Sequence, residues 1–208
     1  MGECYIFAAG SYYGLWQRPN PDDFLIAADG GYPVCQSEGL RPDLVIGDFD
    51  SLPAPPDHPN VIRLPVEKDD TDLLAAIREG LRHGCTVFRL YGGTGGPRPE
   101  HTLANYQCLL FLAAHGARGY LYGDGYVVSA VRNGILSLPA ADCGNVSVFA
   151  LSGPAVGVTL RGLQYPLQEA RLTPEMPLGV SNAFRGEPAE ISVRSGTLLV
   201  FWDLPRRH

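Results

Sequence analysis

Acidic side chains follow an apolar run in the first half of the sequence at a spacing that suits metal binding. Asp48 and Asp50 come directly after Leu44–Ile46, and the alternating geometry of an extended chain places both carboxylates on one side. Two carboxylates held so close repel each other unless a cation lies between them. Mg²⁺ takes such oxygen ligands and commonly shares them with phosphates. We therefore predict a metal site at Asp48 and Asp50, with Asp72 as a third ligand.

A second acidic segment, Lys68-Asp69-Asp70-Thr71-Asp72, precedes a helical pattern. Part of it is explained by capping, because Asp and Thr cap helices well and acids favour the first turn through the helix dipole. One helix needs only one cap, so the remaining carboxylates exceed that need. We predict that Asp72 joins the metal ligands and that Lys68 meets a phosphate.

A glycine-rich loop, residues 92–98, runs from an apolar segment into a helical pattern that begins near His101. Glycines let backbone N–H groups approach a phosphate closely, and Arg98 adds a bidentate donor. Neither a Walker A motif nor a dinucleotide-binding fingerprint is present. A further turn, Asp29-Gly30-Gly31, follows another apolar run. Acids for Mg²⁺ together with a glycine loop and an arginine are the groups that phosphoryl transfer requires.

The elements that must position these groups differ between the two halves of the chain. Up to about residue 120, buried-type strands alternate with helical segments at 72–83 and 101–115, which predicts a parallel sheet covered by helices on both faces. The strands expected there are 5–9, 24–28, 44–46 and 87–91. In such sheets ligands bind at the carboxyl ends of the strands, where the polar clusters lie. From about residue 125 short strands separated by Pro and Gly predict an antiparallel β-sandwich. The strands expected there are 126–131, 135–138, 146–151, 156–160, 190–193 and 197–202. We therefore expect an α/β nucleotide-binding domain of three layers at 1–122 and a β-sandwich domain at 123–208.

Composition excludes several classes of protein. The formal net charge is −6 and no run of Lys or Arg occurs, so a nucleic-acid-binding face is not expected. Five widely spaced cysteines without a CxxC motif argue against a disulfide framework or a zinc site. The start of the sequence lacks the basic region of a signal peptide, and no segment reads as a membrane span. We expect a cytoplasmic protein without a membrane partner.

Taken together, the motifs resemble those of thiamine pyrophosphokinases. The resemblance covers nearly the whole chain, and the pairing of GDFDS with DDTD is specific. The matching segments of the first half are 29–31, 47–51, 69–72 and 101–105, and those of the second half are 162–167, 179–182, 191–193 and 196–200. The loop Gly95–Asn105 departs from the family's GGRxDHxLAN pattern through one inserted residue, two added prolines and Glu100 in place of the usual Asp.

The resemblance implies the reaction ATP + thiamine giving AMP + thiamine diphosphate, with Mg²⁺ as cofactor and a homodimer whose sites lie at the dimer interface. It implies that Asp29, Asp48, Asp50 and Asp72 form the catalytic centre, the last three as metal ligands. The residues expected to contact ATP are Lys68, Asp69, Thr71, Gly95, Gly96, Arg98, His101 and Asn105. Ser181 and Asn182 are expected to face thiamine, and Trp202 to stack on a thiamine ring, since a cation is attracted to an aromatic face.

Two other functions remain open at this point. Asp48-Phe49-Asp50 is also the DxD pattern with which glycosyltransferases bind a nucleotide sugar through a metal. A nucleotide sensor of the same fold without catalytic activity is the other, since a fold by itself does not fix a function.

Overall fold

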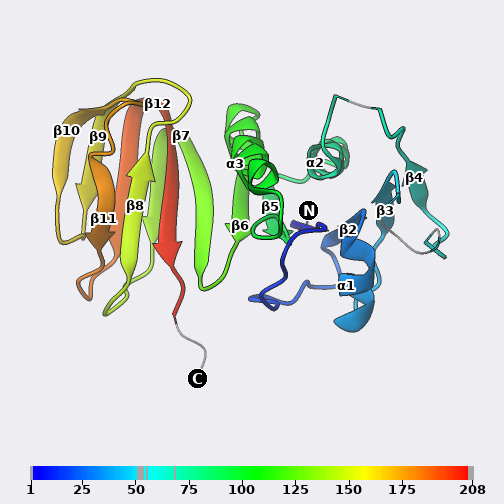
Figure 1. The fold of residues 1–208 in the computed structure, drawn as a ribbon. Helices are drawn as coiled ribbons and strands as arrows, with labels where there is room; N and C mark the ends of the chain where they lie inside the picture. Colours follow the sequence, from blue (N-terminus) through cyan, green and yellow to red (C-terminus); the bar gives the residue numbers. More distant parts are fainter. Residues whose placement is uncertain (1, 51–53, 55, 68, 206–208) are drawn as a thin grey trace. The chain divides into compact units, whose positions relative to one another are not determined.

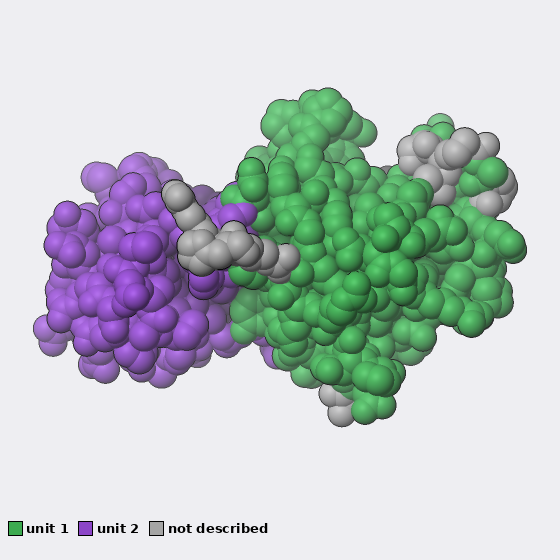
Figure 2. All heavy atoms as spheres, turned by 90° about the horizontal axis from the view of Figure 1, so that it is seen from below, with its two compact units in different colours: residues 1–108, 119–124 green, residues 109–118, 125–208 purple. Residues whose placement is uncertain are grey.

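The structure, a computed structural model, describes residues 2–50, 54, 56–67 and 69–205. The chain divides into two compact units, coloured separately in Figure 2. Unit 1 comprises Met1–Cys108 and Gly119–Asp124, and unit 2 comprises Leu109–Arg118 and Gly125–His208. The main change of unit thus falls at residue 124, beside the expected boundary at 122, and a second change falls inside a helix. That 1–122 and 123–208 fold as separate domains stays a prediction.

Unit 1 is built on strands in the order β6-β5-β1-β2-β3-β4 (Figure 1). Each of the pairs β5–β1, β1–β2, β2–β3 and β3–β4 is parallel. The strands β1, β2 and β3 are almost continuously buried, as expected for apolar runs covered on both faces. The bounds are β1 (Cys4–Phe7), β2 (Phe24–Ala28), β3 (Leu44–Gly47), β4 (Val61–Arg63), β5 (Val87–Tyr91) and β6 (Arg118–Tyr122).

Three helices accompany these strands: α1 (Gly31–Ser37), α2 (Asp72–Arg82) and α3 (Pro99–Ala114). Both α1 and α2 contact β1 and β2, and Figure 1 shows them on opposite sides of these strands. The helix α2 is strongly amphipathic, and its buried face consists of Leu73, Ala76, Ile77 and Gly80. The helices α2 and α3 were expected from the sequence, whereas α1, β4 and β6 were not.

The face of the sheet opposite α2 is an aromatic layer. The rings of Tyr5 and Phe7 stack against Tyr91, and Tyr91 stacks against Tyr122 with ring centroids 4.6 Å apart. Arg89 donates to the hydroxyl of Tyr122 from the same face. Burial raises the pKa of Tyr5 to about 12, so its hydroxyl stays neutral. The stacked rings therefore hold β1, β5 and β6 together on this face of the sheet.

Unit 2 is an antiparallel β structure in which one long strand serves two sheets. The first half of β12 lies between β7 and β9, with β10 beyond β9, and its second half lies between β7 and β8, with β11 beyond β8. Buried side chains such as Val148, Leu160, Ile191 and Val200 fill the core between them. The bounds are β7 (Tyr126–Leu138), β8 (Asn145–Phe149), β9 (Ala155–Arg161), β10 (Leu167–Leu172), β11 (Gly179–Ala183) and β12 (Ala189–Asp203).

The predicted fold class is confirmed: an α/β unit with a parallel sheet is joined to a β-rich unit. Within the described residues, no helix combines the length and the apolar composition that a membrane span requires.

Candidate active site

Glycines allow the carboxyl ends of β1, β2, β3 and β5 to approach one another closely. A Cβ atom on Gly31 would clash with the carbonyl oxygen of Phe7, and one on Gly92 would clash with the carbonyl oxygen of Ala8. A Cβ atom on Gly47 would lie 3.0 Å from the Cα atom of Asp29. Because glycine has no side chain, the loops that follow these strands can pack against each other's backbone. The residues carried by those loops are therefore brought to one place.

Asp29, Asp48 and Asp50 form a cluster at this edge of the sheet. One carboxylate oxygen from each lies within 4.8 Å of the others. Asp29 is buried, Asp48 is half-buried and Asp50 is exposed, so the cluster opens from the protein towards solvent. Three carboxylates at this separation repel one another without a cation and are a hard oxygen donor set. The donor set fits a hexacoordinate divalent ion such as Mg²⁺ that keeps positions for water or phosphate.

The backbone around the cluster takes conformations that residues other than glycine rarely adopt. Asp29 has a φ of 46° and Phe49 a φ of 62°, both in the left-handed region. The Asp29 N–H donates to the carbonyl oxygen of Ile46 at 2.8 Å, which ties the end of β2 to β3. The Asp50 N–H donates to Oδ1 of Asp48 at 3.3 Å. Such strain persists only where the surrounding structure holds it, and it is concentrated at functional sites.

Asp72 is not part of this cluster, although the sequence analysis places it among the metal ligands. It is the first residue of α2, where an acidic side chain favours the helix dipole. The preceding residue, Thr71, caps the helix by accepting a hydrogen bond from the Leu74 N–H at 3.2 Å. The structure therefore groups Asp29 with Asp48 and Asp50, and a metal-ligating role for Asp72 stays a prediction.

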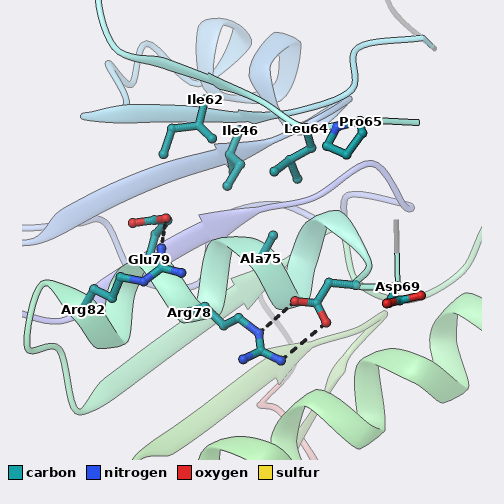
Figure 3. Close-up of a pocket in the computed structure, with 10 residues that line it drawn as sticks. Ile46, Ile62, Leu64, Pro65, Asp69, Ala75, Arg78, Glu79 and Arg82 are labelled. Carbon is teal, nitrogen blue, oxygen red and sulfur yellow. Dashed lines mark hydrogen bonds and ion pairs between the residues drawn. The ribbon is translucent and has the colours of Figure 1, made fainter. Parts of the chain in front are cut away.

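The acidic segment before α2 lies beside a pocket of about 390 Å³ between α2 and the strands β3 and β4 (Figure 3). Asp69 lines this pocket and is exposed. Asp70 also lines it and forms an ion pair with Arg78 at 2.8 Å. Lys68, expected to meet a phosphate, lies outside the described residues.

The glycine loop is held by backbone contacts and one buried side chain. Asn105 on α3 donates from Nδ2 to the carbonyl oxygen of Gly93 at 2.8 Å, so its amide positions the loop. A Cβ atom on Gly95 would lie 2.5 Å from the hydroxyl oxygen of Tyr13, which explains a glycine there, and Gly96 is exposed with a φ of 83°. That these two glycines and Asn105 bind ATP stays a prediction.

The charged end of the loop is exposed. Arg98 donates from Nε to Oε1 of Glu100 at 2.8 Å, and His101 lies exposed in the first turn of α3. Pairing with Arg98 holds the pKa of Glu100 below its usual value. This contact uses the Nε–H of Arg98, and a guanidinium carries four further N–H donors on its two terminal nitrogens.

In unit 2 the predicted thiamine contacts have different surroundings. Asn182 is buried and its amide is engaged with backbone: Oδ1 accepts from the N–H groups of Tyr165 and Ala183, and Nδ2 donates to the Tyr165 carbonyl oxygen at 2.6 Å. Ser181 is exposed with a φ of 58°. Trp202 is half-buried and packs against the core of unit 2.

Sequence reasoning did not single out Tyr165. Its side chain is 64% exposed, and its backbone N–H and carbonyl groups are both held by Asn182. The sequence did offer a signal for Tyr165, because it is an aromatic residue next to Pro166 within the segment 162–167, which matches the family. Asp29 was expected to line the catalytic centre, and its place beside the two other carboxylates depends on the contact between β2 and β3.

Comparison with known proteins agrees with both units. Residues 15–121 match the family model "Thiamin pyrophosphokinase, catalytic domain", and residues 136–198 match "Thiamin pyrophosphokinase, vitamin B1 binding domain". A thiamine pyrophosphokinase of Bacillus subtilis is 25% identical over 182 residues, which cover 84% of this chain and 85% of that protein.

Solved structures agree in fold. The crystal structure of thiamine pyrophosphokinase from Bacillus subtilis has a TM-score of 0.87 at 23% identity, covering 98% of this chain and 100% of that one. The crystal structure of a thiamin pyrophosphokinase family protein from Enterococcus faecalis has a TM-score of 0.83 at 26% identity, covering 98% and 100%. With a cluster of three carboxylates in the matched catalytic segment and a β-rich unit in the matched binding segment, the chain belongs to the thiamine pyrophosphokinase family.

Proposed function

We propose that this protein transfers the terminal diphosphate of ATP to the hydroxyl group of thiamine, giving AMP and thiamine diphosphate. The observation that carries the proposal is the cluster of Asp29, Asp48 and Asp50 at the carboxyl edge of a parallel sheet. Family membership favours this reaction over sugar transfer by a DxD motif.

Asp29, Asp48 and Asp50 would hold Mg²⁺, which supplies positive charge to the phosphates of ATP when bound. The graded burial of the three carboxylates leaves the solvent side of the cluster for the triphosphate. Thr71 and the N-terminus of α2 would offer further hydrogen-bond donors, and Arg98 would offer the guanidinium N–H groups other than the Nε–H that pairs with Glu100. The thiamine oxygen forms a bond to the β-phosphorus, and the bond from that phosphorus to the oxygen bridging it to the α-phosphorus breaks. The hydroxyl proton is released, and AMP departs.

Thiamine carries a positive ring and an aromatic ring, and unit 2 presents groups of matching chemistry. Tyr165 offers an exposed aromatic face on a backbone that Asn182 holds rigidly, and Ser181 offers an exposed hydroxyl. Trp202 packs on the core, which favours Tyr165 as the stacking residue. Asn182 then acts by positioning Tyr165, because its amide already makes three backbone hydrogen bonds.

We also propose that the chain forms a homodimer. Met176, Leu178 and Val180 are exposed apolar side chains at 64%, 54% and 40%, and they alternate along the segment that leads to Ser181. Three exposed apolar side chains within five residues favour burial against a second copy. Sedimentation should show a dimer that Leu178→Glu dissociates, and a monomeric wild-type protein would refute the assembly. ATP as substrate and unpaired cysteines favour the cytoplasm as its location.

The activity is tested by mixing the protein with ATP, MgCl₂ and thiamine and measuring AMP. We expect AMP release only when thiamine is present, and its loss when the metal is removed with a chelator. A sensor would bind ATP without releasing AMP, and a glycosyltransferase would turn over only with nucleotide sugars; either result would reject the proposal.

The identity of the third metal ligand is tested separately. Asp29→Asn should weaken Mg²⁺ binding, measured by calorimetry without nucleotide, because Asp29 lies in the cluster. If Asp72→Asn weakens binding of the bare ion and Asp29→Asn does not, the ligand set is the one expected from sequence, Asp48, Asp50 and Asp72.

A further inference from the structure

Two thiols meet at a glycine on the α2 side of the sheet in unit 1. Cys4 begins β1, Cys85 lies in the turn between α2 and β5, and both are buried, at 0% and 4% exposure. Gly80 of α2 lies against each of them. Its carbonyl oxygen accepts from the Cys85 N–H at 3.0 Å, and a Cβ atom on it would lie 2.8 Å from Sγ of Cys4. The lack of a side chain at Gly80 is thus what gives the Cys4 thiol its place beside the turn.

The pairing of β1 with β5 places both cysteines at the amino ends of neighbouring strands, Cys4 at the start of β1 and Cys85 just before β5. Cys4 is paired with Phe88 in the parallel ladder between β1 and β5, and Cys85 precedes Phe88 by three residues. The two side chains share a hydrogen bond. Residues from three elements, β1, α2 and the turn before β5, therefore form one cluster.

The two thiols differ in pKa. Burial raises the pKa of the Cys4 thiol well above its usual value, and so does its hydrogen bond to Cys85. The hydrogen bond from Cys4 lowers the pKa of Cys85 to about 7, with a further contribution from the nearby His83. Asp23 opposes both thiolates and Asp43 that of Cys4. Cys85 is therefore the more nucleophilic sulfur at neutral pH, and Cys4 stays protonated until it gives up its proton in the second step of an oxidation.

We propose that Cys4 and Cys85 form an oxidation site that a small peroxide converts into an intramolecular disulfide. The inference does not depend on the proposed function. The two cysteines lie at the amino end of β1, whereas the carboxylates of Asp29, Asp48 and Asp50 lie at the carboxyl edge of the sheet.

The chemistry proceeds in two balanced steps. The Cys85 thiolate attacks one oxygen of hydrogen peroxide, the O–O bond breaks, and hydroxide leaves; Cys85 is oxidised to a sulfenic acid and the peroxide is reduced. The Cys4 sulfur then attacks the Cys85 sulfur, the S–O bond breaks, and the departing hydroxide combines with the Cys4 proton to give water. The net result is one disulfide and the consumption of one peroxide.

The other cysteines provide internal controls. Cys35 and Cys108 are buried like the pair, but burial raises their pKa to about 12 and about 11. Cys143 is exposed. If accessibility alone governed oxidation, Cys143 would react and the pair would not; if burial alone protected thiols, Cys85 would behave like Cys35.

The test uses the full chain carrying Cys143→Ser, so that linkage between molecules through the exposed thiol is excluded. The folded protein is treated with hydrogen peroxide, quenched with an alkylating agent and mapped without reduction. We expect a Cys4–Cys85 linked peptide and the loss of two titratable thiols, while the metal-dependent activity is retained. Cys35→Ser should leave the linked peptide unchanged, and Cys4→Ser should leave Cys85 as a sulfenic acid that dimedone traps.

Failure of the linked peptide to form in the folded protein, or its formation only after urea is added, would overturn the proposal. A second measurement covers the case in which a variant does not fold. In the unmodified protein at pH 7.5, iodoacetamide should label Cys85 about tenfold or more faster than Cys35 and Cys108, because thiolate content sets the rate. Equal rates for the three buried cysteines would contradict the assignment.

Discussion

The two units use polar side chains in opposite ways. In unit 1 Asp29, Asp48 and Asp50 converge as a group of like charges, while glycines and backbone hydrogen bonds hold the loops that carry them. In unit 2 the polar residue expected to bind ligand, Asn182, is buried and its amide is engaged with backbone. The exposed groups next to it, Tyr165 and Ser181, are the ones that remain available.

The difference follows from the geometry of the sheets. Parallel strands all end at the same edge of the sheet, so the short loops that follow them bring their side chains together. Glycines, which have no Cβ atom, let the backbones of these loops pack against each other. Antiparallel strands separated by irregular loops need polar side chains to fix those loops, because buried backbone groups must find partners. We therefore expect the clustered charges of unit 1 to act on a ligand, and the buried amide of Asn182 in unit 2 to hold the backbone.

The largest expected effect comes from Asp48→Asn, which removes one charge from the cluster and keeps the shape. We expect turnover to fall by about 10³-fold, because a group that stabilises the transferring phosphates is lost. Steady-state AMP release measures it, and circular dichroism checks that the fold is intact. Asp22→Asn, an exposed acid outside the cluster, is the matched control. Activity of Asp48→Asn within a factor of two of the parent would contradict a catalytic role for the carboxylates of unit 1.

The second prediction concerns the glycines that bring the loops together. Gly31→Ala should lower the free energy of unfolding by about 3 kcal/mol, because the new methyl group clashes with the Phe7 carbonyl and the backbone must move. Gly134→Ala, where the nearest atom to a Cβ is 3.4 Å away, should change it by no more than about 0.5 kcal/mol. Urea unfolding measures both. Equal effects would mean that close approach does not account for the glycine at Gly31.

Asn182 and Ser181 sharpen the comparison within unit 2. Asn182→Ala should cost about 2 kcal/mol of stability, because the buried N–H groups of Tyr165 and Ala183 lose their acceptor. Ser181→Ala should leave stability nearly unchanged and raise the KM for thiamine. Thermal unfolding and thiamine titration of the two variants separate the roles. A stable Asn182→Ala protein with a raised KM would instead make the amide a direct ligand.

The smallest effect is expected at the exposed pair Arg98 and Glu100. Glu100→Gln removes a negative charge that neutralises Arg98 and repels phosphate, so the KM for ATP should fall, by no more than about threefold, since exposed ion pairs are weak. Glu100→Asp, which restores the acid usual in the family, is the control that keeps the charge. A higher KM in the Gln variant would show that Glu100 supports nucleotide binding.

The sequence predicted much of unit 1 because each of its elements carries a local signal. The strands Phe24–Ala28 and Val87–Tyr91 were expected with these bounds, and α2 was expected from its apolar periodicity. The short helix α1, Gly31–Ser37, contains a proline and has no capping side chain, so no local pattern marked it. The place of Asp29 beside Asp48 could not be read from spacing, because it arises from the contact between β2 and β3.

Unit 2 was harder to predict because its longest strands contain residues typical of turns. We expected separate strands on either side of Asn133-Gly134 and of Ser195-Gly196, yet β7 and β12 each run through the interruption. Asn133 has a φ of 45°, and its side chain accepts from the Gly196 N–H at 2.9 Å, so the two irregularities face each other as a bulge. Only the pairing of distant strands distinguishes such a bulge from a turn.

The long strand β12 has a consequence for how unit 2 folds. It pairs with β7, β8 and β9, all of which precede it in the chain, so these strands leave the ribosome before the strand that pairs with all three. Until β12 arrives, they expose unpaired edges that favour association with other molecules. Because these pairings are distant in sequence, we expect unit 2 to complete folding slowly and to be the part of the molecule that depends most on chaperones during synthesis.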